Sequence, residues 1–471
     1  MKSCTASKSE ITNLLAPLRK CLGEKNVLIA PEDRICYAYD GSKQKYLPDI
    51  VVRPQTTQHV VEAVRLANEH EIPVYPRGAG SGLTGGAVPV FGGMVLDFAQ
   101  MNRILEIVSE DLVATVEPGV VTQTLQTEAA KYNLFYPPDP ASAAFSTIGG
   151  NVAECAGGIT GLKYGVTRDY ILALEVVLAD GSVINTGRKT LKSVTGYDLT
   201  RLLVGSEGTL GIFTRITVKL IPLPEKIETL LVFFPTPKDA VESANTIISH
   251  NILPRALEFI DKSSIDCIKG YRQEIELPED ANAILIIDID GEETSVQKGI
   301  ARVKTFVSEH GAIKVIAASD AKERNDLWEV RRILSPALYK IAPYKINEDI
   351  CVPRSRILEI LHAINDMNSR YPRLKAANFG HIGDGNIHVN VMYEVEGDRP
   401  FAEKMIDEII RSTIRLGGTI SGEHGIGNVK SKFLPLEIAP QELQIMKDIK
   451  RLFDPKGILN PGKFFNNYTM R

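Results

Sequence analysis

The stretch PRGAGSGLTGGAVP, residues 76–89, decides the fold of this chain. Gly80, Gly82 and Gly85 formally satisfy the GxGxxG pattern of Rossmann dinucleotide-binding domains, which requires a strand before the loop and a helix directly after it. The strand-like run IPVYP precedes the loop, but Pro89 and the further glycines of GGAVPVFGGMVLDF cannot open a stable helix. The Rossmann interpretation is therefore disfavoured.

A loop this rich in glycine predicts an anion site of another kind. Consecutive amides without Cβ atoms can turn toward one anion and form a nest for a diphosphate, and Arg77 would add positive charge. The alternative is a tight turn without a ligand. Two further glycine-rich segments, 146–170 and 204–218, argue against that alternative and indicate backbone packed against an extended, flat ligand.

Strands and turns alternate around these glycines as far as residue 224. The runs IPVYP, GGMVLDF, LVATVEPG, ILALEVVLADGSVI and GIFTRITVKLIPLP are rich in Val, Ile and Thr and bounded by Gly, Pro and Asp, as strands are. Asp180-Gly181 predicts a hairpin turn. TQHVVEAVRLANEH, residues 57–70, predicts an amphipathic helix before the first glycine loop.

The pattern changes after Ile221–Pro224, where strand-like and helical runs begin to alternate. ETLLVFFP is followed by PKDAVESANTIISH, ANAILIIDID by SVQKGIARVKTFVSEHG, and INEDICVP by RILEILHAINDMNSRY. This predicts an α+β fold whose second sheet is mainly antiparallel and covered by helices on one face. We expect a helical N-terminal segment over 1–45, a ligand-binding domain over 46–224 and a second domain over 225–471.

The composition excludes several classes of protein. With 54 basic and 58 acidic side chains the net charge is −4, which gives no electrostatic case for nucleic acid. No window approaches the roughly 18 uninterrupted apolar residues of a membrane-spanning helix, and the N-terminus lacks the apolar core of a signal peptide. The six cysteines are scattered without a CxxC pair, which argues against an iron–sulfur site and fits free thiols. We expect a cytoplasmic protein, with peripheral attachment at the membrane through a partner left open.

NFGHIGDGNIHVNV, residues 378–391, carries the most chemical information. Asp384-Gly385 predicts a two-residue type I′ turn, which would set His381 directly opposite His388 with Cβ atoms about 4.5–5.5 Å apart. Two imidazoles at this separation can share a divalent metal. Phe379 and Asn390 would lie on the same sheet face. The alternative for each histidine is a satisfied core residue.

GGTISGEHGIG, residues 417–427, supplies a further candidate ligand. Glu423-His424 follows the helical run FAEKMIDEIIRSTIRLG and, taken alone, could be a helix C-cap and loop. Beside the hairpin, Glu423 completes a His₂Glu set with open positions, which is typical of a catalytic metal, and His424 becomes a candidate base. Zinc is favoured, and iron or manganese would also fit.

These segments, together with YPPDPAS, STIGGNVAECAGG, TGYDLTRLLVGSEGTLG and NPGK, resemble the FAD-binding domain of the vanillyl-alcohol-oxidase, or PCMH-type, flavoproteins. Within that family the chain is similar to the glycolate oxidase D-subunit and D-lactate dehydrogenase branch, from about residue 45 to residue 465. The resemblance implies a two-lobed FAD-binding domain, an α+β cap domain and a C-terminal tail that returns to the flavin. It also implies His381, His388 and Glu423 as metal ligands and His424 as base.

The resemblance further implies which residues contact FAD. The loop 77–86 is expected on the pyrophosphate, and most contacts are expected through backbone. The implied contacts are Pro76, Arg77, Gly78, Ala79, Gly80, Ser81, Gly82, Thr84, Gly85, Gly86, Pro138, Ser142, Thr147, Gly149, Asn151, Gly157, Gly158, Gly165, Asp169, Glu207, Ile212 and Asn460. Some relatives bond the flavin to a histidine near this loop, but here that neighbourhood reads Gly80-Ser81-Gly82, so we expect non-covalent FAD.

The expected reaction is the oxidation of a small D-2-hydroxy acid. The substrate would chelate the metal, which lowers the pKa of the hydroxyl; His424 would accept the proton while C2 passes a hydride to flavin N5. Arg331 would hold the substrate carboxylate in a bidentate fork, and the resemblance points to it rather than to Arg332. Ser335 and Asn390 are expected beside the substrate.

D-lactate or glycolate is the favoured substrate. Some relatives that act on longer diacids place a lysine just before the acidic residue of the strand that ends in VP; here that stretch reads Lys345-Ile-Asn347-Glu-Asp349, which weakens the case for a D-2-hydroxyglutarate-type dehydrogenase. Two rival functions are a flavin oxidase of phenols or sugars and a flavoprotein subunit that only relays electrons. Electrons must leave to a separate acceptor, and family members often work with an iron–sulfur subunit or an electron-transferring flavoprotein. A homodimer is left open.

Overall fold

The computed structural model describes residues 8–271 and 277–465. Over this range the chain forms two compact units. Unit 1 contains the described residues up to Gly157, residues 166–223 and the residues from Glu423 onward. Unit 2 contains residues 158–165 and 224–422. Each unit combines helices with sheets, as the predicted α+β class requires.

The first sheet of unit 1 has the strand order β1-β2-β4-β3. Its strands are β1 (Val27–Leu28), β2 (Ile50–Val52), β3 (Val74–Arg77) and β4 (Met94–Asp97). β2 and β3 both run parallel to β4, whereas β1 pairs antiparallel with β2. The predicted helix is α3 (Thr57–Glu69); the side chain of Thr56 caps it by accepting from the amide of His59. α3 and α1 (Lys8–Leu22) share one hydrophobic core with this sheet.

The second sheet of unit 1 is antiparallel throughout, in the order β5-β6-β10-β8-β9. Its strands are β5 (Ile104–Val108), β6 (Val113–Val116), β8 (Ile171–Val177), β9 (Val183–Gly187) and β10 (Ile212–Lys219). The hairpin predicted at Asp180-Gly181 joins β8 to β9, and Gly181 takes the left-handed conformation (φ 84°) that the turn needs. Two large sheets in one unit, beside the small pair of β7 (Leu134–Phe135) and β11 (Ile221–Pro222), agree with the predicted two-lobed domain.

Short elements complete unit 1. They are α2 (Pro31–Arg34), α4 (Thr122–Ala130), β7 (Leu134–Phe135), α5 (Ile148–Glu154), α7 (Leu199–Leu203), β11 (Ile221–Pro222), α15 (Leu434–Glu437) and α16 (Pro440–Phe453). Residues 78–93, all of which are described, contain no helix between β3 and β4. The rejection of a Rossmann fingerprint is therefore correct, because that motif needs a helix at this point.

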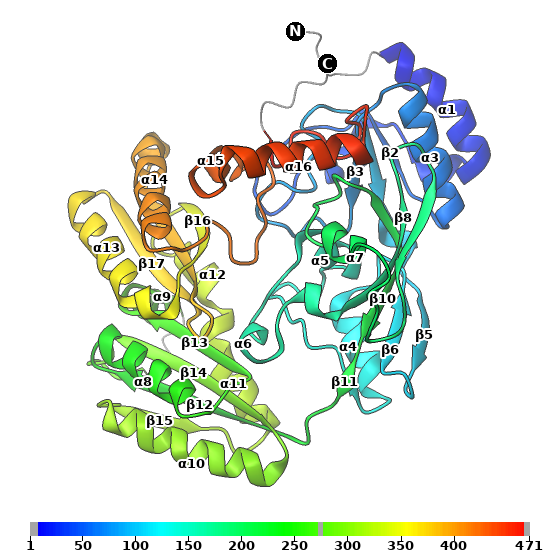
Figure 1. The fold of residues 1–471 in the computed structure, drawn as a ribbon. Helices are drawn as coiled ribbons and strands as arrows, with labels where there is room; N and C mark the ends of the chain where they lie inside the picture. The colour runs from blue at the N-terminus through cyan, green and yellow to red at the C-terminus, as the bar shows by residue number, and fades with distance from the viewer. Residues whose placement is uncertain (1–7, 272–276, 466–471) are drawn as a thin grey trace. The chain divides into compact units, whose positions relative to one another are not determined.

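Unit 2 is built on one antiparallel sheet in the order β15-β12-β14-β13-β17-β18-β16 (Figure 1). Its strands are β12 (Lys226–Phe234), β13 (Ala256–Asp261), β14 (Ala283–Gly291), β15 (Lys314–Ala317), β16 (Tyr344–Cys351), β17 (Leu374–His381) and β18 (Asn386–Tyr393). Its longer helices are α8 (Pro237–Ser249), α9 (Lys262–Tyr271), α10 (Glu293–Glu309), α11 (Ala321–Arg332), α13 (Ile357–Arg370) and α14 (Arg399–Arg415), with the short α6 (Gly161–Tyr164) and α12 (Leu334–Leu338) beside them. The predicted antiparallel sheet and alternating helices are confirmed.

Helices cover both faces of this sheet, so the predicted one-sided cover is wrong. One face, which carries Ile260 and Phe379, shares a core with α9, α11 and α12. The alternate side chains of the same strands, such as Leu257 and Val389, are also buried, and α8, α10, α13 and α14 contact these strands. The sequence signal is the apolar run AILII, residues 283–287, in the first half of β14, because a strand buried on both sides loses its period-two alternation.

The inserted segment 158–165 is fastened to the sheet of unit 2 by one buried carboxylate. Lys163 forms an ion pair with Asp290 and also donates to the backbone oxygen of Asp290 at 2.8 Å. Tyr164 donates its hydroxyl to Asp290 Oδ2 at 2.7 Å. Arg255 lies 3.3 Å from the same carboxylate oxygen. These contacts explain why eight residues flanked by unit 1 segments belong to unit 2.

Candidate functional site

The hairpin of β17 and β18 carries the two predicted metal-binding histidines. Phe379 lies opposite His388, so the predicted register, with His381 opposite His388, is wrong by two residues. The physical reason is a four-residue loop, 382–385, whose last two amides donate to the carbonyl of His381 in place of the two-residue turn. Side chains alternate with period two, so a shift of two keeps both histidines on one face.

The two imidazoles are neighbours despite the shifted register. Their ring centroids lie 5.2 Å apart with nearly perpendicular planes, and both residues are buried. Nδ1 of His381 lies 2.5 Å from Glu258 Oε1. Because a carboxylate accepts the Nδ1 proton, the ring nitrogen of His381 that carries the lone pair is Nε2. We call the sheet face that bears Glu258, His381, His388 and Asn390 the histidine face.

Glu258, in β13, was not among the predicted site residues. Its side chain is fully buried, and its second oxygen accepts from Arg331 Nε at 2.8 Å. Burial alone would raise its pKa, but the charges and hydrogen bonds of His381 and Arg331 bring the pKa down to about 2. The sequence signal was available in the run ALEFID, where an acid stands among apolar strand residues.

Arg331 and Arg332 point in different directions from the end of α11. The Arg331 guanidinium lies over the ring of Phe379 at 4.6 Å, beside the histidine face. Arg332 forms an ion pair with Glu329 and is 52% exposed. Of the two arginines, only Arg331 reaches the histidine face.

The other two expected substrate contacts differ in burial. Asn390 is buried, and its side-chain oxygen accepts from Asn347 Nδ2 at 3.0 Å. Ser335 is exposed and accepts from Lys345 Nζ at 3.2 Å. Asn390 therefore belongs to the histidine face, whereas Ser335 lies beside a lysine at its margin.

Glu423 is the junction residue that directly follows Gly422, the last residue of unit 2. The amide of Gly422 donates at 2.9 Å to the carbonyl of Asp349, and Asp349 pairs with His388. One ligand atom from each of His381, His388 and Glu423 lies within 4.8 Å of the others. Two imidazoles and a carboxylate that leave positions open fit a divalent cation such as zinc.

His424, the expected base, belongs to a loop that unit 1 holds by hydrogen bonds. Its carbonyl accepts from Thr84 Oγ1 at 3.1 Å. The Glu207 carboxylate accepts from the amides of Ile426 and Gly427 at 2.7 and 2.8 Å. Glu207 was expected as a cofactor contact, and both of its oxygens bind this loop.

The first glycine loop meets the physical requirements of an anion nest. Among the described residues, the hydrogen bonds include none donated by the backbone amides of 79–86. Eight consecutive amides without an acceptor fit a diphosphate group. The Arg77 guanidinium packs against the loop. It donates to the carbonyl of Tyr39 at 2.8 Å, and a Cβ on Gly80 would lie 2.3 Å from it.

The second and third glycine segments pack against this loop within unit 1. A Cβ on Gly78 would lie 2.2 Å from Thr147 Oγ1, and Thr147 caps α5. A Cβ on Gly208 would lie 2.5 Å from the ring of Pro76. The amide of Glu207 donates at 2.8 Å to the carbonyl of Ala153 in α5. The three glycine segments therefore contact one another within unit 1.

Two buried carboxyl groups accompany the loop. A Cβ on Gly86 would lie 2.4 Å from Glu154 Oε1, and one on Gly425 would lie 2.2 Å from Glu154 Oε2. Burial, with Glu207 and Asp40 nearby, raises the pKa of Glu154 well above its usual range. Burial also raises the pKa of Glu207 to about 7. These shifts reduce negative charge beside amides that suit an anion.

The remaining expected FAD contacts lie in several places. Gly149 and Asn151 are buried in α5, and Asn151 donates to Thr122 Oγ1 at 2.7 Å. Gly157 lies beside Glu423, whereas Gly158 and Gly165 belong to the inserted segment of unit 2. The side chain of Ile212 lies in the core of the first sheet. Asp169 is exposed and accepts from the amide of Val166. The carbonyl of Pro138 accepts from Gln126, and the carbonyl of Ser142 accepts from two amides of its own loop.

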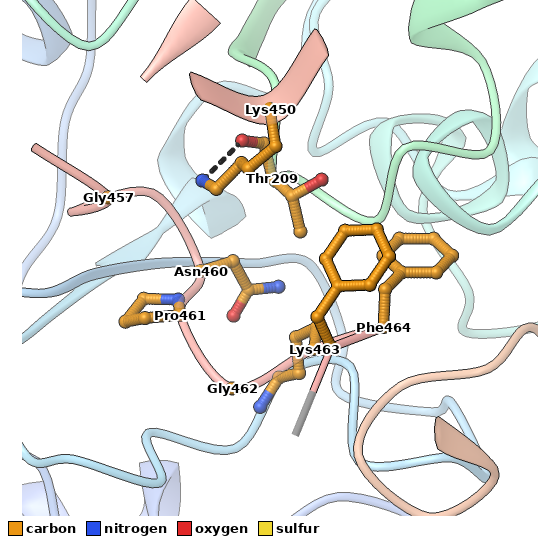
Figure 2. A pocket seen from close by; sticks show the side chains of 9 residues that line it. Thr209, Lys450, Gly457, Asn460, Pro461, Gly462, Lys463 and Phe464 are labelled. Carbon is orange, nitrogen blue, oxygen red and sulfur yellow. Dashed lines mark hydrogen bonds between the residues drawn. The ribbon is translucent and has the colours of Figure 1, made fainter. Parts of the chain in front are cut away.

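The C-terminal segment also forms hydrogen bonds with the glycine loop. Asn460 Nδ2 donates to the carbonyls of Gly86 and Glu207 at 2.9 and 2.6 Å. Figure 2 shows Asn460 and Lys463 on this segment and the bond from Lys450 to Thr209, around a small hollow that they line. The buried Lys463 donates to the carbonyl of Val88 at 2.7 Å. Asn460 therefore joins the tail to two glycine segments.

Five of the six cysteines lie in the described ranges, and all five are free thiols, as expected; Cys4 lies outside the described residues. None of the described helices is both long and apolar enough to cross a membrane.

Comparison with known families agrees with this geometry. Residues 223–464 match the model of the C-terminal domain of FAD linked oxidases. Residues 48–187 match the model of an FAD binding domain. Together the two matches contain the candidate metal ligands and the first two glycine segments.

Characterised relatives cover nearly the whole chain. Glycolate oxidase subunit GlcD of Bacillus subtilis (strain 168) is 43% identical, over 94% of this chain and 94% of its own length. A D-lactate dehydrogenase of Anaerostipes hadrus is 37% identical, over 94% and 95%. A D-2-hydroxyglutarate dehydrogenase of Stutzerimonas stutzeri (strain A1501) is 31% identical, over 96% and 98%.

A solved structure of p-cresol methylhydroxylase with substrate bound has the same fold. The TM-score is 0.81 with 19% sequence identity, and the match covers 98% of each chain. At this identity the likeness concerns the fold, and it agrees with the predicted PCMH-type architecture.

Proposed function

The chain belongs to the FAD-linked oxidases and is an FAD-dependent hydroxy-acid oxidoreductase, and from this premise we propose that it oxidises a small D-2-hydroxy acid to the 2-oxo acid. D-lactate or glycolate is the favoured substrate. The observation that carries the proposal is the group of His381, His388 and Glu423, whose ligand atoms lie within 4.8 Å of one another. The names of the glycolate and D-lactate relatives support the same substrate class.

In this proposal the three residues hold a divalent cation, with zinc preferred. His381 offers Nε2, because its Nδ1 faces Glu258. When bound, such a cation supplies Lewis acidity that lowers the pKa of a coordinated hydroxyl group. Two imidazoles and a carboxylate leave positions open for the hydroxyl and carboxylate of the substrate.

Arg331 binds the substrate carboxylate in this proposal. Glu258 accepts from its Nε, so its two terminal nitrogens remain to form a bidentate pair. The ring of Phe379 lies beneath the guanidinium and keeps its plane fixed. Asn390 and Ser335 are the proposed neighbouring polar contacts.

His424 accepts the hydroxyl proton in this proposal. Imidazole is the side-chain group that most often serves as a general base. The bonds from Thr84 and to Glu207 hold the backbone at His424 and directly after it. A base that is held in place removes a proton more effectively than one on a mobile loop.

FAD binds non-covalently in this proposal, with its diphosphate on the amides of 79–86. When bound, the flavin supplies the hydride acceptor. The absence of a histidine at Gly80-Ser81-Gly82 motivates the non-covalent assignment. Acid precipitation that leaves the yellow colour in the protein pellet would contradict it.

A second candidate substrate is a five-carbon diacid such as D-2-hydroxyglutarate. Lys345 lies on β16 two residues from Asn347, which pairs with Asn390, and it donates to Ser335. A cation at that margin of the histidine face suits a second carboxylate. Lys345→Met should therefore impair oxidation of D-2-hydroxyglutarate and leave D-lactate oxidation unchanged if the diacid is the physiological substrate.

The electrons then pass to a separate acceptor. We propose an iron–sulfur subunit or an electron-transferring flavoprotein, because the CxxC pattern is absent from the sequence and one close relative is named as a subunit. A flavoprotein that only relays electrons is the competing function, but a relay requires no metal ligands.

Anaerobic mixing with D-lactate, glycolate and D-2-hydroxyglutarate tests these assignments. Bleaching of the flavin band by a 2-hydroxy acid supports the proposal, and the ranking of rates identifies the substrate. A flavin that no hydroxy acid bleaches, but that a reduced partner protein does, would support the relay instead.

A further inference from the structure

Glu258 joins two parts of the proposed site that have different tasks. Its Oε1 lies 2.5 Å from Nδ1 of His381, and its Oε2 lies 2.8 Å from Nε of Arg331. All three residues belong to unit 2, and Glu258 pairs directly with His381 across the adjacent strands β13 and β17. One carboxylate thus contacts a proposed metal ligand and the proposed carboxylate-binding arginine.

The position of Glu258 is costly unless both contacts form. Its side chain is fully buried, and a buried carboxylate without partners is strongly destabilising. Its strand neighbours Leu257 and Phe259 are buried and apolar, so the carboxylate is the exception in this part of β13. The charge is therefore explained by the two groups that it contacts.

We propose that Glu258 is a positioning residue that holds His381 as an Nε2 ligand and simultaneously orients Arg331, so that metal binding and substrate-carboxylate binding depend on one side chain. The proposal rests on the proposed function of the histidine face. A carboxylate that accepts the Nδ1 proton fixes the tautomer and the ring orientation of a metal-binding histidine. A carboxylate that accepts from Nε leaves the two terminal guanidinium nitrogens directed away from it.

The test compares Zn²⁺ affinity in the FAD-loaded full chain, as wild type and as Glu258→Gln. The amide has one acceptor oxygen, so it can satisfy only one of the two donors and carries no charge. We expect Zn²⁺ affinity, measured by competition with a chromophoric chelator, to fall about 10–100-fold. Retained FAD absorbance would show that the flavin site is unaffected.

A second measurement separates the arginine from the metal. At saturating Zn²⁺ we expect Glu258→Gln to raise KM for D-lactate about tenfold, because Arg331 loses its orientation. Glu258→Asp, which keeps the charge but shortens the reach, should recover part of the Zn²⁺ affinity. A purely structural role for Glu258 would not give this pattern.

Asp288→Asn is the matched control. Asp288 is a buried carboxylate on the neighbouring strand β14, and it contacts Trp328 of α11 and Thr229 but neither His381 nor Arg331. We expect its Zn²⁺ affinity to stay within about twofold of wild type, because the substitution removes no partner of the site.

The outcomes separate this proposal from the proposed function. Wild-type protein that oxidises D-lactate without binding Zn²⁺ would overturn the metal assignment and the role of Glu258 with it. Zn²⁺ binding that is equal in wild type and Glu258→Gln would overturn the role of Glu258 alone. If Glu258→Gln does not fold, NMR of ¹⁵N-histidine-labelled wild type decides: Zn²⁺ on Nε2 of an Nδ1-protonated His381 supports the proposal, and Zn²⁺ on Nδ1 refutes it.

Discussion

The histidine face of unit 2 and the glycine loop 79–86 of unit 1 present their chemistry in opposite ways. On the histidine face, side chains project from paired strands, and the strand register determines which of them are neighbours. In the glycine loop, the backbone amides have no acceptor among the described residues, and a Cβ atom on Gly80 or Gly86 would collide with its surroundings. The first site depends on side-chain identity, and the second depends on backbone shape.

This difference determines how each site should respond to substitution. Removing a side chain from the histidine face deletes a ligand but leaves the sheet, which neighbouring strands and helices support on both sides. Adding a side chain to a glycine segment displaces backbone that several other groups contact. Effects on the histidine face should therefore be chemical, whereas effects on the glycine segments should be geometric.

His388→Ala should have the largest effect. It deletes a proposed ligand on a buried, fully paired strand, so D-lactate turnover should fall by at least about a thousandfold while bound FAD remains. Steady-state rates and flavin absorbance measure the two quantities. The control is His362→Ala, an exposed histidine of α13, which should keep full activity. Normal turnover of His388→Ala in metal-free buffer would remove the histidine face from the mechanism.

Three residues of the histidine face, His381, His388 and Asn390, were predictable from sequence because strands have a simple period. The predicted turn was too short, and the register was wrong by two residues, yet His381 and His388 still share a face. An error of one residue would have separated them. Glu258 was not predicted, because its relation to His381 arises from β13 pairing with β17, strands that lie more than one hundred residues apart in sequence.

Gly425→Ala should have the next largest effect. Its φ is +82°, and an added Cβ would lie 2.2 Å from Glu154 Oε2 and 2.9 Å from Glu207 Oε1. Because Glu207 holds the amides after His424, displacing it should slow flavin reduction about a hundredfold. Stopped-flow reduction by D-lactate measures this rate.

Gly417→Ala is the matched control for that substitution. Gly417 has nearly the same φ, +75°, but no atom lies within 4 Å of its added Cβ. Both variants should lose about 1 kcal/mol of stability from backbone strain, and only Gly425→Ala should lose activity. Equal rates in the two variants would indicate that crowding at Gly425 does not reach His424.

Glu207→Gln should have a smaller effect on the same loop. The amide can accept from only one of the backbone groups of Ile426 and Gly427, so the loop is held less firmly. We expect flavin reduction to slow about tenfold. Glu117→Gln, at an equally buried glutamate that pairs with Arg103, should leave the rate unchanged. A rate for Glu207→Gln that equals wild type would mean that Thr84 alone positions the loop.

The loop contacts of Glu207 show what sequence patterns could not provide. The three glycine segments were recognisable by composition, but composition does not tell which segments meet. Glu207 was expected at the cofactor, and its side chain contacts residues more than two hundred positions away, which was not predicted. Such contacts come from chain segments that return to unit 1 after the whole of unit 2, and no local periodicity encodes them.

Asp288→Asn should have the smallest effect, a change in how stability depends on pH. Burial raises the pKa of Asp288 to about 6, against about 3.9 in an unfolded chain. Between these pH values the Asp288 carboxyl is protonated in the folded state and ionised in the unfolded state. The contribution of Asp288 to the free energy of unfolding is therefore fully present below about pH 4 and is lost as pH rises through about 6. From near pH 4.5 to near pH 7.5, wild type should therefore lose roughly 2 kcal/mol more unfolding free energy than the variant. Trp328, the single tryptophan of the chain, donates to Asp288 and reports unfolding of unit 2 by fluorescence; equal pH slopes would mean that Asp288 is ionised throughout.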